Sequence, residues 1–76
     1  MNTALASEVS ALLEARFPNA EISVEIDGNR AQVRVRAAEL AELSRVKRQQ
    51  AVYGVIGRYV TDGTLHAVTI DAQPLA

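Results

Sequence analysis

The stretch EISVEIDGNRAQVRVR, residues 21–36, restricts the fold more than any other part of the sequence. Apolar residues take every second position on either side of the triplet DGN, a pattern typical of two half-buried strands joined by a tight turn. A loop of Gly28 and Asn29 predicts that Ile26 faces Ala31, Val24 faces Val33, Ile22 faces Val35, Asp27 faces Arg30 and Glu21 faces Arg36. A loop of Asp27 and Gly28 would change these pairs but keep the same two faces. The hairpin therefore has one apolar face for a core and one charged face, which we interpret as a solvated sheet surface.

Helical patterns lie on both sides of the hairpin. Residues 3–16 carry leucine and valine at helical spacing, and Pro18 ends this helix. Residues 38–43, AELAEL, predict a short helical turn, and residues 44–61 predict a longer helix. We expect the buried side of the longer helix to consist of Val46, Val52, Tyr53, Ile56, Tyr59 and Val60.

A third strand is predicted at residues 65–71, LHAVTID, after Gly63 in the left-handed position that ends many helices. The helical segment between the second and third strands is a crossover, so these two strands can pair in parallel. The expected fold class is α+β, with a three-stranded mixed sheet and the helices packed on one face. We expect its core to include Leu12, Val24, Val33, Val46, Tyr53, Ile56 and Val68.

The composition narrows the classes of function. With 76 residues, the sequence has room for a single domain, residues 1–76. Its net charge of −1 argues against a protein built globally around a polyanion, so any basic function must be local. The sequence contains no cysteine, which excludes disulfides, thiolate metal ligands and a cysteine nucleophile. No apolar stretch approaches the roughly 20 residues of a membrane span, and the first residues lack the basic region of a signal peptide. We therefore expect a cytoplasmic protein with no membrane contact, monomeric when alone.

The stretch SRVKRQQAVYG, residues 44–54, presents an electrostatic problem. Ser44 has the side chain of a helix N-cap. The first turn after it carries three cations, Arg45, Lys47 and Arg48. Each is unfavourable there by roughly 0.3–1 kcal/mol, because a helix N-terminus already bears a partial positive charge. Pairing with Glu39 or Glu42 just upstream is one explanation. The more economical one is that the combined positive potential attracts an anion, such as a phosphate, a carboxylate or an acidic partner surface.

Residues 44–72, SRVKRQQAVYGVIGRYVTDGTLHAVTIDA, resemble the BolA family, most closely its short, acid-stress-type bacterial branch. The matching features are the Ser-x-Val-x-Arg run from Ser44, the Val-Tyr pair that ends at Tyr53, and the Leu-His-Ala-Val run that contains His66. The hairpin also fits without a gap, so the resemblance covers nearly the whole chain as one BolA-like domain. It implies a class II KH-like αββααβ fold, which agrees with the order of elements derived above from the residues.

The resemblance also implies a function. BolA-like proteins are non-enzymatic partners of monothiol glutaredoxins in iron–sulfur homeostasis and the stress response. They share a [2Fe–2S] cluster, held by the glutaredoxin cysteine and glutathione on one side and by histidine on the other. His66, the only histidine, stands at the position of the family's C-terminal histidine ligand. We expect the cluster only in the shared complex and none bound by this chain alone.

Two site residues have competing interpretations. His66 falls on the same alternate positions as the apolar residues of the predicted third strand, which favours a histidine packed in the core. The other interpretation is an iron ligand, because imidazole binds iron well. At the hairpin loop, Arg30 stands where many relatives carry a second histidine or cysteine ligand. We favour a pair between Arg30 and Asp27 across the turn; the alternative is a contact with a negatively charged cluster or with a glutathione carboxylate.

Some BolA-like proteins bind DNA as transcriptional regulators, so the basic helix start is also a candidate DNA site, through Arg45, Lys47 and Arg48. A KH-type grip on RNA is not expected, because residues 42–45 lack the glycines of a GXXG loop. An enzyme is not expected either, since the sequence has one histidine, no cysteine and no phosphate-binding glycine loop. The main hypothesis is glutaredoxin binding through His66 and the helix start, and the alternative is DNA binding through that same start.

Overall fold

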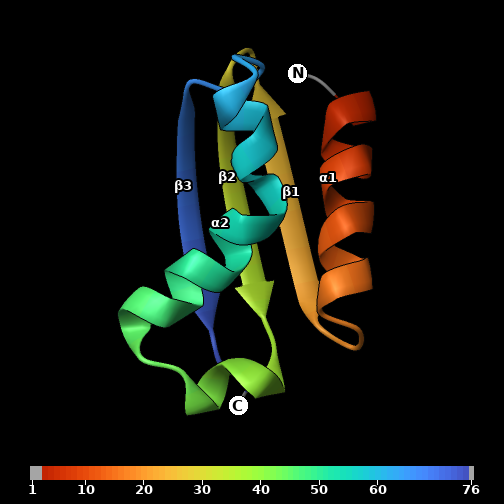
Figure 1. The fold of residues 1–76 in the computed structure, drawn as a ribbon. Coiled ribbons are helices and arrows are strands. Elements are labelled where there is room, and N and C mark those ends of the chain that lie inside the picture. The colour runs from red at the N-terminus through yellow and green to blue at the C-terminus, as the bar shows by residue number, and fades with distance from the viewer. Residues whose placement is uncertain (1–2, 76) are drawn as a thin grey trace.

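Residues 3–75, which the computed structural model describes, place their helices on one face of a sheet (Figure 1). The elements follow the chain in the order α1 (Thr3–Arg16), β1 (Glu21–Asp27), β2 (Arg30–Arg36), the 3₁₀ helix η1 (Ala38–Glu42), α2 (Arg45–Thr61) and β3 (Ala67–Gln73). The sheet order is β1-β2-β3, with β1 antiparallel to β2 and β3 parallel to β2. The predicted α+β class and its mixed three-stranded sheet are confirmed. No helix within the described residues is both long enough and apolar enough to cross a bilayer.

The hairpin has the register that a loop of Gly28 and Asn29 predicts. Ile26 lies opposite Ala31, and Asp27 lies opposite Arg30. Gly28 has a φ of 61°, whereas Asn29 does not have a positive φ. A positive φ at the first loop residue alone is the arrangement of a type II′ turn, whose twist matches that of the paired strands. The turn thus depends on glycine at position 28 and places no special demand on position 29.

The core lies between the helices and the covered face of the sheet. Its buried side chains come from every helix and strand and include Val9, Leu13, Phe17, Ile26, Val33, Val35, Leu40, Val52, Ile56, Tyr59 and Leu65. The hydroxyl of Tyr59 also donates a hydrogen bond to the Glu8 carboxylate, and Arg58 Nη2 donates to the Tyr59 oxygen at 3.2 Å. This network joins α2 to α1 at the edge of the core.

Two residues expected in the core are exposed instead. Val46 is 64% exposed and Tyr53 45% exposed. The buried stripe of α2 consists of Val52, Ile56 and Tyr59, and Tyr53 is one residue away from it, about 100° around the helix. Val46 lies in the first turn of α2, which projects past the β3 edge of the sheet (Figure 1). The other expected core residues are buried or pack partly buried against the core: Leu12, Val24, Val33, Ile56 and Val68.

The third strand begins two residues later than predicted, at Ala67 rather than Leu65. Leu65 is 1% exposed, and its N–H donates to the Tyr59 carbonyl at 2.9 Å. This bond returns the chain to the end of α2 before the strand starts. His66 is consequently outside β3, in the connection that precedes it.

Candidate functional site

His66 is exposed and lies beside the hairpin loop. Its main-chain N–H donates to the Asn29 carbonyl at 2.8 Å, and its Nδ1 lies 3.1 Å from Asn29 Nδ2. Although His66 shares the parity of the half-buried Val68, it lies beyond the strand, where its side chain remains in solvent. An exposed ring contributes little to the core, so packing does not account for this histidine.

The connection that presents His66 is held by local bonds. The Thr64 N–H donates to Asp62 Oδ1 at 2.9 Å. The pKa of Asp62 lies below its usual value, first because of a hydrogen bond from the Thr64 side chain and then because of this main-chain bond. Gly63 has a φ of 84°, the left-handed conformation predicted for it. Together with the buried Leu65, these contacts fix the path of the chain on both sides of the turn into His66.

Arg30 lies at the same end of the sheet as His66. It is the first residue of β2, opposite Asp27 on one side and opposite Ala67, the neighbour of His66, on the other. Its side chain is exposed. Arg30 and His66, the two candidate residues, thus lie at the same end of the sheet. Arg30 is also in the register expected for a pair with Asp27.

The three cations at the start of α2 differ in exposure and in their contacts. Ser44 is the N-cap, as predicted, and its Oγ accepts the Lys47 N–H at 3.3 Å. Arg45 and Lys47 are exposed. Arg48 is half-buried, and its Nε donates to the carbonyls of Leu40 at 2.9 Å and Leu43 at 3.0 Å.

Arg48 therefore stabilises the turn between η1 and α2. Its partners are main-chain carbonyls rather than the upstream carboxylates considered from the sequence, and Glu39 pairs instead with Arg16 at 2.9 Å. The cations that still face solvent at the helix start are Arg45 and Lys47.

The basic helix start and His66 lie at opposite ends of the molecule. Figure 1 shows the beginning of α2 near η1, and the hairpin loop with the α2–β3 connection at the other end of the sheet. A straight helix with the 17 residues of α2 spans about 25 Å. The two regions named in the glutaredoxin hypothesis are therefore separated by the length of α2.

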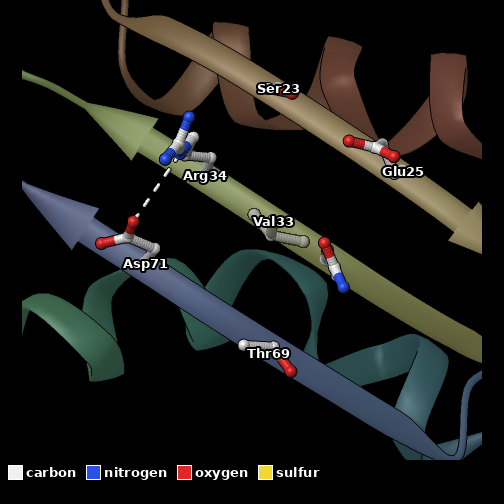
Figure 2. Close-up of a pocket in the computed structure, with 7 residues that line it drawn as sticks. Ser23, Glu25, Val33, Arg34, Thr69 and Asp71 are labelled. Carbon is white, nitrogen blue, oxygen red and sulfur yellow. Dashed lines mark ion pairs between the residues drawn. The ribbon is translucent and has the colours of Figure 1, made fainter.

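The uncovered face of the sheet carries paired charges. Arg34 and Asp71 point toward each other from neighbouring strands, with Arg34 Nε 3.7 Å from Asp71 Oδ2 (Figure 2). Arg36 Nη2 donates to the same carboxylate oxygen at 3.0 Å, and this bond is the main cause of the lowered pKa of Asp71. A shallow hollow of about 440 Å³ lies over this face, lined by Ser23, Glu25, Gln32, Val33, Arg34, Thr69 and Asp71. The paired charges support the interpretation of this face as a solvated surface.

An apolar hollow of about 330 Å³ lies between α2 and the edge strand β3, lined by Gln49, Gln50, Tyr53, Gly54 and Ile70. Gln49 Nε2 donates to the Ile70 carbonyl at 2.9 Å, which occupies part of the open strand edge. Sequence reasoning missed this surface because it assigned Tyr53 to the core.

Comparisons with known proteins place this geometry in a family. No protein-family model matches the chain. The acid stress protein IbaG of Escherichia coli K12 is 39% identical over 67 residues, which cover 87% of this chain and 79% of IbaG. An uncharacterized protein of Acinetobacter guillouiae is 35% identical over 66 residues, covering 87% of this chain and 80% of that protein.

Two solved plant structures have the same fold. BolA1 from Arabidopsis thaliana superposes with a TM-score of 0.78 at 24% identity, over 91% of this chain and 89% of that one. The BolA domain of SufE1 from Arabidopsis thaliana gives a TM-score of 0.81 at 20% identity, over 97% of this chain and 95% of that domain. The chain belongs to the BolA family. The motif residues of this BolA-family chain lie in two places: Ser44 and Arg48 build the start of α2, and His66 lies at the far end of that helix.

Proposed function

We propose that this BolA-family chain is a non-enzymatic partner of a monothiol glutaredoxin and shares a [2Fe–2S] cluster with it in the cytoplasm. The observation that supports this proposal most is His66, an exposed imidazole fixed at the end of the sheet by hydrogen bonds to Asn29. By similarity to an acid stress protein, we place this role in the stress response.

The donor atoms of this chain fit one part of such a shared site. Neutral imidazole binds the iron of some [2Fe–2S] clusters. Within residues 3–75 no three side chains of histidine, cysteine, aspartate or glutamate gather into a metal site. His66 is the only histidine in the sequence, which has no cysteine, so the partner and glutathione would supply the thiolates. The chain's own contribution is to present one nitrogen ligand and an exposed surface around it.

The test is the visible absorption and circular dichroism of a cluster-loaded monothiol glutaredoxin titrated with this chain. His66→Ala should abolish the spectrum of the mixed complex, because it removes the one imidazole ligand. Arg30→Ala is the matched control from the same end of the sheet and should leave that spectrum present. Arg30→His should strengthen cluster binding if the loop reaches the cluster. An unchanged spectrum with His66→Ala would show that His66 is not a ligand.

DNA binding through the start of α2 is the second candidate, favoured by the exposed Arg45 and Lys47 beside a helix N-terminus. Because His66 lies at the other end of α2, the two functions can be separated by substitution. Replacing Arg45 and Lys47 together by alanine should weaken DNA binding and leave the mixed cluster spectrum intact. His66→Ala should have the opposite effects, and DNA binding should weaken as salt is added.

A further inference from the structure

Asn29 contacts His66 through its main chain and through its side chain. Its carbonyl accepts the His66 N–H at 2.8 Å and the Ala67 N–H at 3.3 Å. Its side-chain amide nitrogen lies 3.1 Å from Nδ1 of the His66 ring. The main-chain bonds hold the backbone of His66 against the hairpin, and the side-chain bond restrains the ring itself.

The side-chain bond determines which ring nitrogen is available. With Nδ1 engaged by Asn29, Nε2 is the nitrogen that remains for another ligand. When the amide N–H donates to Nδ1, the proton of the neutral ring is on Nε2, and Nε2 has no free lone pair. A half-turn of the amide about its last side-chain bond puts the amide oxygen in the same place. That oxygen accepts a hydrogen bond from Nδ1–H, and the lone pair of the neutral ring is then on Nε2.

We propose that Asn29 is the positioning residue for His66, orienting the ring and supporting both of its neutral tautomers so that Nε2 can act as the ligand. This inference rests on the proposed function, in which His66 binds the shared [2Fe–2S] cluster. Metal-binding histidines almost always donate their other ring N–H to an oxygen acceptor, which fixes the tautomer and the ring orientation. An asparagine amide supplies a donor for the ligand-free ring and, after the half-turn, that acceptor.

The turn itself does not need asparagine at this position. Gly28 carries the positive φ of the hairpin loop, and Asn29 does not have one. The bonds from Asn29 to the backbone of His66 and Ala67 use its carbonyl, which any residue provides. Asn29→Ala therefore removes the contact with the ring and keeps the backbone around it, which makes this substitution a specific test.

The first measurement uses the isolated chain and needs no cluster. Since His66 is the only histidine, long-range ¹H–¹⁵N correlations report its tautomer without ambiguity. In the neutral ring, Asn29→Asp should shift the proton toward the Nδ1–H tautomer, because a carboxylate can only accept. Asn29→Ala should also change the tautomer ratio, whereas the neighbouring Arg30→Ala should leave it as it is in the unsubstituted chain. Equal ratios in all four proteins would overturn the role of Asn29.

The second measurement uses the mixed complex with the cluster-loaded glutaredoxin. Asn29→Ala should weaken formation of that complex about 10-fold, the lower end of the effect of losing a partner of a metal-binding histidine, and Arg30→Ala should not. If His66→Ala abolishes the complex while Asn29→Ala forms it with unchanged affinity, the inference about Asn29 is wrong and the proposed function stands. If His66→Ala leaves the complex unchanged, the proposed function fails, and the tautomer ratios still decide whether Asn29 positions the ring.

Discussion

Replacing Arg48 by methionine separates the structural cation at the start of α2 from its exposed neighbours. In the folded chain one N–H of Arg48 bridges the carbonyls of Leu40 and Leu43, at 2.9 and 3.0 Å. Methionine keeps the apolar stem and a good helix propensity but has no donor. The substitution therefore removes the bridge between η1 and α2 and changes little else.

The magnitude follows from two opposing effects. A hydrogen bond to a charged group contributes about 1.5–3 kcal/mol, and the half-buried position of Arg48 favours the lower value. Removing a cation from a helix N-terminus returns roughly 0.3–1 kcal/mol. We expect a net loss of about 1 kcal/mol in the free energy of unfolding. For a domain of this size, that lowers the melting temperature by roughly 4–8 °C.

The assay is urea unfolding followed by far-ultraviolet circular dichroism, with Lys47→Met as the matched control. Lys47 uses only its main-chain N–H in the cap with Ser44, so Lys47→Met should be neutral or stabilising by about 0.3–1 kcal/mol. If Arg48→Met and Lys47→Met have the same midpoint and slope, the carbonyl bridge contributes nothing and Arg48 belongs with the exposed cations.

Three further predictions concern stability. Burial, followed by the bond to Glu8, raises the pKa of Tyr59. The stability that this shift confers is therefore complete below about pH 10 and is lost as pH rises through the folded pKa. In alkaline unfolding curves, Tyr59→Phe should lose less of its free energy of unfolding than the unsubstituted chain. The bond from Arg36 lowers the pKa of Asp71, so the stability that this shift confers is present above about pH 4 and is lost as pH falls through the folded pKa. The free energy of unfolding of Asp71→Asn should lack this loss in acid. Gly63→Ala should destabilise the fold by roughly 1 kcal/mol in urea, because alanine is strained at the φ of 84°, and an unchanged midpoint would contradict this.

The two faces of the hairpin were predictable because alternating apolar residues define them. The register was open between a loop of Gly28 and Asn29 and a loop of Asp27 and Gly28, and the structure has the first of these. The orientation of α2 was less certain, because Val46 and Tyr53 form a second apolar stripe beside Val52 and Ile56. Periodicity shows that a helix has apolar stripes, but the position of the sheet decides which stripe is covered.

The site was predictable in part. The sequence predicted the cap at Ser44, which the structure confirms, and singled out His66 as a candidate ligand. It did not show the contact between Asn29 and His66, which depends on the parallel register of β2 and β3. No turn connects those two strands, so no local signal sets their register. The partners of Arg48 were equally hidden, because they are main-chain carbonyls around η1. The distance between His66 and the helix start was available from the sequence, since the predicted helix is long enough to separate them.

The small number of exposed cations limits how strongly the basic helix start can bind DNA. Two exposed cations, Arg45 and Lys47, remain there, and Arg48 adds a third contact only if its outer guanidinium nitrogens reach a phosphate. Two or three phosphate contacts predict that the logarithm of the binding constant falls with the logarithm of salt with a slope of about −1.8 to −2.7. Affinity should then fall about 12- to 40-fold between about 50 and 200 mM salt, whereas 6–10 contacts would lower it about 10³- to 10⁵-fold. A steeper measured slope would show that DNA contacts cations elsewhere on the chain, and that the start of α2 is not the whole interface.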